Sequence, residues 1–437
     1  MRLSRRAFGA GLAATAVAMS VAPARAAEPG HVLRSWYSLI LELVRQTPTY
    51  SPPVAARAFA YLGITTFEAV ASGSSVLQSL AGQARKLADV PQRKTGGTYD
   101  NAVIVHAAMA YAAQTYFGNT GPSGLRAMKA LEKKLHTEAA QGLDNSIWEE
   151  SAAYGKQVAE HIHAWSMGDG GAVVENLGFP EEWTLTKGAA HWVPTNTLAL
   201  QQKPLLPHWG ECLTIAMPEN GACPLPPPPA YSEDANSEFY KQAVEVCETG
   251  KALTLEQKAI ARFWSDDPML SPTPPGHWMW IAMQIFEKEN TDLEKSVEVL
   301  ARLGMAINDG FIACWKSKFE YDLVRPVTYI KRVIDKTWEP LLITPPFPEY
   351  PSGHSTQSGA AAVVLAKDFG DNFAFTDATH ARDGLAPRNF KTFWAAAEEA
   401  AISRLYGGIH YRAAIDQGLE QGKCVGNFVN MLKTRKA

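Results

Sequence analysis

The sequence lacks the short signatures of several common enzyme classes. It contains no Cys-x-x-Cys, no His-Glu-x-x-His and no Gly-x-Ser-x-Gly, so the usual dithiol, zinc-protease and hydrolase-elbow sites are excluded. Basic residues never form a long block, and 41 Lys and Arg stand against 44 Asp and Glu, for a net charge of -3. Electrostatic binding to nucleic acid or anionic lipid is therefore not expected. The composition favours a protein that acts on small molecules.

Long apolar runs and alternating strand patterns are also scarce. After residue 26 no stretch is apolar for the roughly 18 residues that a membrane-spanning helix needs, so no such helix is predicted. Hydrophobic residues make up 46% of the chain and charged residues 19%, which excludes an intrinsically disordered chain and a collagen-like fibre. The 437 residues suffice for one large domain or two of ordinary size.

The first 26 residues read as an export signal. Arg5 and Arg6 precede a weakly apolar run, which ends at the small-x-small sequence Ala24-Arg25-Ala26. This order of features is typical of a twin-arginine signal peptide followed by a signal-peptidase site. We therefore expect residues 1–26 to be removed and the mature protein to be periplasmic or secreted.

Five cysteines have to be placed in that oxidising compartment. Cys212 and Cys223 flank a loop that runs into a proline-rich segment, where a local disulfide is one interpretation. Cys247, Cys314 and Cys424 lie within apolar helical patterns and are expected to be buried thiols.

The pattern of apolar residues predicts an all-α fold. Residues rich in Ala, Leu, Glu and Lys recur with helical spacing in nine segments. Two irregular regions, 168–207 and 218–229, interrupt them. The second is the predicted boundary between an N-terminal helical region, 27–230, and a C-terminal one, 231–437, giving two packed helical bundles; one continuous bundle that carries the same loop stays open. The predicted helices are 36–46, 54–71, 102–117, 124–140, 147–165, 238–249, 255–263, 277–287 and 291–315.

Three segments near the C-terminus carry the residues of chemical interest. In the first, Lys318 and Arg325 lie seven residues apart, nearly two helical turns, so on one helix they would share a face about 10 Å apart. Pro326 disfavours a helical Arg325 and places that arginine at the helix end. Taken alone, the pair favours a solvated basic face.

The second segment is proline-rich and ends at Ser352-Gly353-His354, where an alanine-rich helix is predicted to begin. Unpaired backbone N–H groups at a helix start form a cradle for an anion, and His354 would lie beside it. The third segment runs from Arg404 to His410 through two glycines, which break the helix and can turn both side chains toward one pocket. The alternative for His354 is a capping or packing histidine, and the alternative for the third segment is a glycine helix stop followed by a histidine without a role in the site.

Together the three segments, Lys-x6-Arg-Pro, Pro-Ser-Gly-His and Ser-Arg-x5-His, resemble the shared signature of the vanadium-dependent haloperoxidases and the type 2 phosphatidic acid phosphatases. That superfamily has an all-helical fold that binds vanadate or phosphate. The signature covers residues 318–410, and a looser similarity to the bacterial haloperoxidase branch extends over most of the mature chain.

The resemblance implies a role for each motif residue. His410 would be the axial ligand of vanadium through a neutral imidazole, and His354 would be the acid-base group for hydrogen peroxide. Halide would then be oxidised to hypohalous acid, which halogenates an organic acceptor, while the metal acts as a Lewis acid. The groups that would bind the vanadate oxygens are Lys318, Arg325, Ser352, Gly353 and Arg404.

Further residues resemble the haloperoxidase branch. Trp315, Pro345 and Phe347 are similar to the apolar residues of the halide pocket, which would keep water from the reactive centre; ordinary core packing is their alternative. In that branch an aspartate holds the arginine of the third motif, and Asp266 or Asp267 would serve here.

One position departs from the signature. The third motif usually continues with an aspartate four residues after its histidine, whereas this chain has Ala414 and its nearest acid is Asp416. The partner that orients His410 is therefore unassigned, which puts the control of its tautomer in doubt.

Two other functions stay open at this point. A periplasmic acid phosphatase on the same fold would use His410 to attack phosphorus and His354 to protonate the leaving group. An exported protein that sequesters oxyanions would bind vanadate or phosphate without turnover. The apolar wall around Trp315 favours the haloperoxidase. The sequence does not indicate the halide, the organic acceptor or the oligomeric state.

Overall fold

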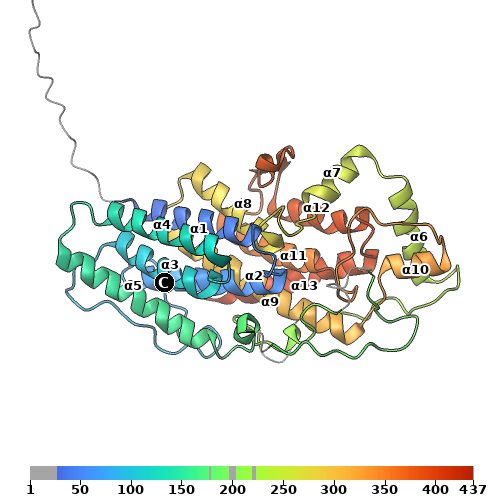
Figure 1. Ribbon diagram of the computed structural model, residues 1–437, viewed down its shortest axis with the longest axis horizontal. Helices are drawn as coiled ribbons and strands as arrows, with labels where there is room; N and C mark the ends of the chain where they lie inside the picture. The colour runs from blue at the N-terminus through green and yellow to red at the C-terminus, as the bar shows by residue number, and fades with distance from the viewer. Residues whose placement is uncertain (1–26, 177–178, 196–202, 219–222, 437) are drawn as a thin grey trace, which may run out of the picture.

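The computed structural model of the chain describes residues 27–176, 179–195, 203–218 and 223–436. The predicted export signal, residues 1–26, lies outside them. Thirteen α-helices dominate the described residues, and one short antiparallel pair of strands is present, so the all-α prediction is confirmed (Figure 1). The helices are α1 (Pro29–Arg45), α2 (Pro52–Ala71), α3 (Asn101–Phe117), α4 (Gly121–Ala139), α5 (Asn145–Ser166), α6 (Glu238–Lys251), α7 (Leu255–Phe263), α8 (Thr273–Glu289), α9 (Leu293–Tyr321), α10 (Pro326–Val333), α11 (Gly353–Phe369), α12 (Phe393–Tyr406) and α13 (Arg412–Met431); the strands are β1 (Phe375–Asp377) and β2 (Arg388–Phe390).

Helix α9 is the longest element and the centre of the fold. Asp292 caps its start by accepting a hydrogen bond from the Lys295 backbone N–H at 2.8 Å. The predicted helix 291–315 was too short at its C-terminal end, because α9 continues to Tyr321. There Asp322, with a left-handed φ of 45°, ends the helix.

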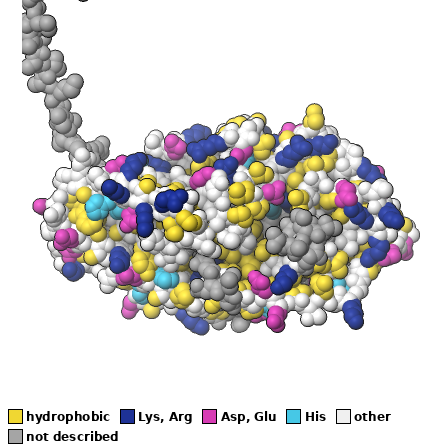
Figure 2. Space-filling model, viewed as in Figure 1, with side chains coloured by type: hydrophobic (Ala, Val, Ile, Leu, Met, Phe, Trp, Pro, Cys, Tyr) yellow, Lys and Arg dark blue, Asp and Glu magenta, His cyan; other side chains and the backbone are white. Residues whose placement is uncertain are grey.

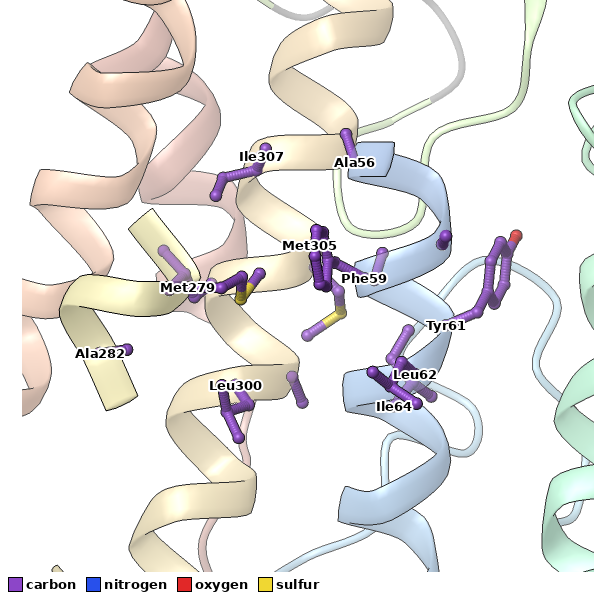
Figure 3. Packing of buried hydrophobic residues seen from close by; sticks show 14 of the residues in the cluster. Ala56, Phe59, Tyr61, Leu62, Ile64, Met279, Ala282, Leu300, Met305 and Ile307 are labelled. Carbon is purple, nitrogen blue, oxygen red and sulfur yellow. The ribbon is translucent and has the colours of Figure 1, made fainter. Parts of the chain in front are cut away.

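Helices α2 and α9 pack closely along their length and form the middle of the hydrophobic core (Figure 3). Two glycines allow the approach. A Cβ on Gly63 would lie 2.7 Å from the Leu300 carbonyl oxygen, and one on Gly304 would lie 2.8 Å from the Ala60 Cα. The apolar side chains between the two helices include Phe59, Leu62, Ile64, Leu300, Met305 and Ile307.

Among the described helices, α2 is long and apolar enough to cross a membrane by length and composition, and its apolar window is completely buried inside the fold. It therefore behaves as a core helix in this structure.

Helix α9 links regions that are far apart in the sequence. It packs against α2 from the predicted N-terminal region and against α11 and α13 from the predicted C-terminal region. Helices α3, α4 and α5 lie toward one end of the elongated molecule, and α6 and α10 lie toward the other (Figure 1).

On the face seen in Figure 2, basic and acidic side chains are interspersed over the surface. The domain boundary near residue 230 stays a prediction.

The cysteine assignments need correction. Cys223 is bonded to Cys424 of α13, across 201 residues of sequence, and not to Cys212. Cys212 is a buried free thiol, as are Cys247 and Cys314. The local pairing was wrong because separation along the chain says little about which cysteines the fold brings together.

Candidate active site

The three sequence segments converge at the C-terminal end of α9 and the N-terminal end of α11. Lys318 lies in the last turn of α9, and Arg325 is the residue just before α10. They do not share one helix face as predicted, because α9 ends at Tyr321 and the chain turns before Pro326. Arg325 instead reaches the third segment, where its Nη1 donates to the Ile409 carbonyl oxygen at 2.8 Å.

Lys318 is completely buried and fastens the loop that leads to the second motif. Its Nζ donates to the carbonyl oxygens of Pro348 and Glu349, both at 3.0 Å, and to that of Pro351. Burial, together with the charge of Arg325, lowers the pKa of Lys318 to about 7. An anion beside this ammonium would favour its charged form.

Arg325 and Arg404 are the other buried cations of the site. Burial lowers the pKa of each guanidinium to about 10. The Arg325 Nη2 and the Arg404 Nε have no hydrogen-bond partner among the residues that the structure describes. Buried N–H donors without partners are costly, and the oxygens of a bound oxyanion would satisfy them.

The second motif forms the predicted helix start. Ser352 caps α11, its Oγ accepting from the Ser355 backbone N–H at 3.3 Å, and Gly353 is the first helical residue. His354 follows in the first turn, with its Nε2 3.7 Å from the Asp266 Oδ2. Burial and then the charge of Arg404 lower the pKa of His354 to about 4, so its neutral form predominates near pH 7.

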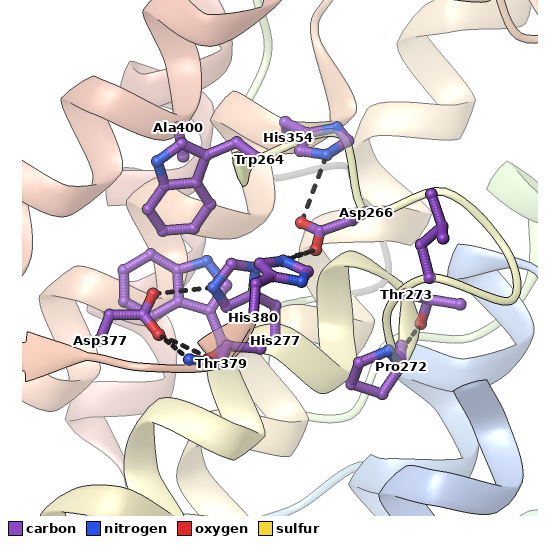
Figure 4. A network of polar contacts seen from close by, with 12 residues as sticks. Trp264, Asp266, Pro272, Thr273, His277, His354, Asp377, Thr379, His380 and Ala400 are labelled. Carbon is purple, nitrogen blue, oxygen red and sulfur yellow. Dashed lines mark hydrogen bonds and ion pairs between the residues drawn. The ribbon is translucent and has the colours of Figure 1, made fainter. Parts of the chain in front are cut away.

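Behind His354 lies a buried chain of alternating carboxylates and imidazoles (Figure 4). Asp266 Oδ1 is 2.8 Å from His277 Nδ1, and His277 Nε2 is 2.8 Å from Asp377 Oδ2. His380 Nε2 lies 3.6 Å from the same Asp266 oxygen. Residues of these types also bind metal ions, and the ligand atoms of Asp266, His277 and His380 lie within 4.8 Å of one another.

The buried carboxylates and imidazoles of this hydrogen-bonded series shift one another's pKa values. Burial alone would lower the pKa of His277, but the charges of Asp266 and Asp377 and the hydrogen bonds with them outweigh it and raise the pKa to about 10. Burial likewise opposes the ionisation of Asp266, yet the charge of His277 and the histidine hydrogen bonds hold its pKa well below the usual range. A proton on His277 between two carboxylates is therefore the favoured state.

The expected contact between an aspartate and Arg404 is not a direct ion pair among the described residues. Arg404 Nη1 donates to the Trp264 carbonyl oxygen, and both Asp266 and Asp267 favour the guanidinium charge only through longer-range attraction. Of Asp266 and Asp267, the two residues predicted to hold Arg404, Asp266 instead lies beside His354, at 3.7 Å.

The orienting partner of His410 is Glu349. The Glu349 Oε1 lies 2.9 Å from the His410 Nδ1 and also accepts from the Tyr411 backbone N–H at 2.8 Å. Asp416, the nearest acid in sequence, is exposed on α13. Burial, then the charges of Arg325, Lys318 and Arg404, lower the pKa of His410 well below its usual range. His410 is therefore neutral, as ligation requires.

The predicted halide-pocket residues lie against the cations. The ring centroids of Trp315 and Phe347 are 4.9 Å apart. Arg325 Nε donates to the Phe347 carbonyl oxygen at 2.8 Å, and Arg325 Cζ lies 4.9 Å from the Phe347 ring centroid. Lys318 Nζ is 5.1 Å from the same ring. Pro345 precedes this ring in the loop and accepts from the Phe347 backbone N–H at 3.0 Å. An apolar wall thus borders the anion-binding groups.

Comparison with known proteins decides the family. The family described as the VCPO second helical-bundle domain matches residues 298–337 and 331–436. A crystal structure of a bacterial vanadium-dependent iodoperoxidase superposes with a TM-score of 0.85 and 37% sequence identity, covering 93% of this chain and 97% of that one. The chain belongs to the vanadium-dependent haloperoxidases.

Two further relatives are more distant. A holo bacterial vanadium-dependent chloroperoxidase superposes with a TM-score of 0.70 at 18% identity, covering 89% of this chain and 94% of that one, and shows the shared fold. The vanadium chloroperoxidase of Curvularia inaequalis is 26% identical over 217 residues, 36% of this chain and 36% of that protein. The match thus spans about a third of that curated relative's length.

The sequence assigned no role to four residues that lie beside the motif histidines or behind them: Glu349, Asp377, His380, and His277, which stands in a segment that resembles the haloperoxidase branch. One signal was available for Glu349, which is the one acid in the proline-rich segment 345–354 of a site that lacks an acid at position 414. Asp377 and His380 carry no comparable signal, because they reach the site from β1 and the turn that follows it.

Anion binding should stabilise this haloperoxidase. Lys318, Arg325 and Arg404 repel one another, and a bound oxyanion would remove that cost. Orthovanadate at 100 times its dissociation constant is expected to add about 2.7 kcal/mol to the free energy of unfolding. Thermal unfolding with and without orthovanadate measures the effect as a rise in Tm, with equal ionic strength of sodium chloride as the control. An unchanged Tm at saturating orthovanadate would contradict it.

Proposed function

We propose that this haloperoxidase oxidises halide with hydrogen peroxide in a vanadate-dependent reaction that yields hypohalous acid. The observation that carries the proposal is a neutral His410, whose Nε2 lies 3.2 Å from Arg325 Nη1 among three buried cations. Two of these cations, Arg325 and Arg404, have N–H donors without a partner among the described residues. An imidazole lone pair surrounded by cationic N–H groups suits an oxyanion whose central atom accepts a nitrogen ligand.

The residues present fit vanadate. His410 would ligate it through Nε2, and Lys318, Arg325 and Arg404 would neutralise its oxygens. Ser352 and the Gly353 backbone N–H, at the start of α11, would add hydrogen bonds. When bound, vanadate supplies a Lewis-acid centre that activates hydrogen peroxide toward halide.

His354 supplies the acid-base group in this proposal. Because its neutral form predominates near pH 7, it can accept a proton from hydrogen peroxide, and Asp266 3.7 Å away stabilises the resulting imidazolium. His354 would then return this proton to the oxygen that leaves as water. The chain through His277 to Asp377 keeps Asp266 ionised for this purpose.

Two observations bear on which halide is oxidised: the apolar wall of Trp315 and Phe347, and the similarity to a bacterial iodoperoxidase. Trp315 and Phe347 exclude water beside the cations, which favours a weakly hydrated anion. Similarity to the bacterial iodoperoxidase over 93% of this chain supports iodide as the first halide to test, followed by bromide and chloride.

The proposal is tested by assaying purified protein with hydrogen peroxide and each halide, before and after adding orthovanadate. Triiodide formation reports iodide oxidation, and halogenation of monochlorodimedone reports bromide and chloride. A parallel phosphatase assay without vanadate uses p-nitrophenyl phosphate. We expect halide oxidation that requires vanadate, with negligible phosphate release. Phosphatase turnover that vanadate inhibits, without halide oxidation, would overturn the proposal in favour of phosphoryl transfer.

A further inference from the structure

The acid that orients His410 comes from an unexpected part of the chain. His410 is followed four residues later by Ala414, which is fully buried in the first turn of α13 and offers no side-chain acceptor. The carboxylate in contact with His410 Nδ1 belongs to Glu349, 61 residues earlier in the sequence. Glu349 is itself fully buried.

The two neighbours of His410 specify the same tautomer. Arg325 Nη1, 3.2 Å from Nε2, is a donor only, so Nε2 must accept and carries the lone pair. The single proton of the neutral ring is then on Nδ1, from which it is donated to the Glu349 Oε1 at 2.9 Å. Without the carboxylate, Nδ1 would lose its acceptor, and the ring would be free to rotate or change tautomer.

Glu349 is held in place by hydrogen bonds to its backbone and to its side chain. Its backbone N–H donates to the Leu323 carbonyl oxygen at 3.0 Å, and its own carbonyl oxygen accepts from Lys318 Nζ at 3.0 Å. Its Oε1 also accepts from the Tyr411 backbone N–H, which ties the carboxylate to the chain beside His410. The cation that binds the oxyanion thus also fixes the acid that aims the imidazole.

We propose that Glu349 is the positioning residue of His410, and that it replaces, from the loop before α11, a carboxylate that position 414 does not provide. The consequence is that the two positions should be exchangeable. An aspartate at 414 would lie one helical turn beyond His410, at a helix N-terminus that favours a negative charge. The inference rests on the proposed use of His410 as a vanadate ligand, but its test needs no turnover.

The test measures the dissociation constant of orthovanadate by equilibrium dialysis for four proteins: wild type, Glu349→Ala, Glu349→Gln, and Glu349→Ala combined with Ala414→Asp. Loss of a carboxylate behind a ligating histidine typically weakens metal binding about 10- to 100-fold. We expect that loss in Glu349→Ala, a smaller loss of about threefold or more in Glu349→Gln, and recovery of most of the affinity in the double variant.

Two measurements separate positioning from a merely structural role. Two-bond ¹H–¹⁵N spectra of histidine-labelled protein report the tautomer of His410, which should be Nδ1–H in wild type and in the double variant, and mixed in Glu349→Ala. Asp416→Ala is the matched control, because it removes the nearest acid in sequence from the exposed face of α13, and it should bind vanadate like wild type.

Several results would overturn the inference. Glu349→Ala that binds vanadate within twofold of wild type would do so, as would a double variant no better than the single one. If Glu349→Ala does not fold, unchanged affinity in the nearly isosteric Glu349→Gln decides against it. Failure of the proposed function shows differently: wild type would then lack halide oxidation, whatever the affinities of the variants.

Discussion

Replacing His410 with alanine is expected to abolish vanadate-dependent halide oxidation. It should also weaken orthovanadate binding by about 100-fold or more, because losing the ligand itself costs more affinity than losing a residue that only hydrogen-bonds to the ligand. The Nε2 lone pair of His410 faces Arg325 Nη1 at 3.2 Å, and the pKa shift caused by burial and by three cations keeps the imidazole unprotonated. Lys318, Arg325 and Arg404 would still attract the anion, but no nitrogen would be bonded to it. Equilibrium dialysis and the triiodide assay measure the two losses.

His31→Ala is a suitable control for the His410 variant, because it removes an exposed histidine of α1 that is distant in sequence from all three motifs. It should leave binding and turnover unchanged. Stoichiometric, tight vanadate binding with full turnover in His410→Ala would show that His410 is not the ligand.

Replacing His354 with alanine is expected to separate turnover from binding. General acid-base catalysis typically contributes about 10²- to 10⁴-fold to a rate, so halide oxidation should fall by that factor while part of the vanadate affinity remains. In wild type the neutral form of His354 is present above about pH 4 and is lost as the pH falls through that value. The acid limb that this protonation causes in the pH–rate profile should be absent from the variant. Steady-state rates across pH, together with dialysis, provide the measurement.

An unchanged rate in His354→Ala would remove it as the acid-base group. His380→Ala serves as the comparison: it removes another imidazole next to Asp266, at 3.6 Å, without removing the one in the first turn of α11. A larger effect of His380 than of His354 would place the proton-transfer group on the other side of Asp266.

Local patterns predicted much of this fold and of its anion-binding groups. Helix periodicity is set by neighbours three and four residues away, so the predicted and observed helices agree closely, as for Leu255–Phe263. The break at Gly407-Gly408 was also predictable, because glycine adopts left-handed backbone conformations easily. Gly408, two residues after the end of α12, has a φ of 76°. The Ser352 cap follows from the same local rules.

Contacts between distant segments were not predictable in this way. The pairing of Glu349 with His410 and of Cys223 with Cys424 depends on how α9, α11 and α13 pack. Neither pairing can be read from the spacing of apolar residues in the sequence. The expected shared face of Lys318 and Arg325 failed for a related reason. Asp322, which lies between them, has a left-handed backbone conformation and ends α9. The turn that follows α9, and not a continuous helix, brings the two cations together.

The position of α9 also bears on whether the catalytic half can exist alone. The family match begins at residue 298, and every predicted motif follows it. Yet Lys318 lies in the last turn of α9, and α2 packs against that helix, where Gly304 meets the backbone of Ala60. A fragment that starts at residue 231 would expose that apolar stripe to water. The N-terminal helices, which carry none of the motifs, therefore complete the support on which the oxyanion-binding residues lie.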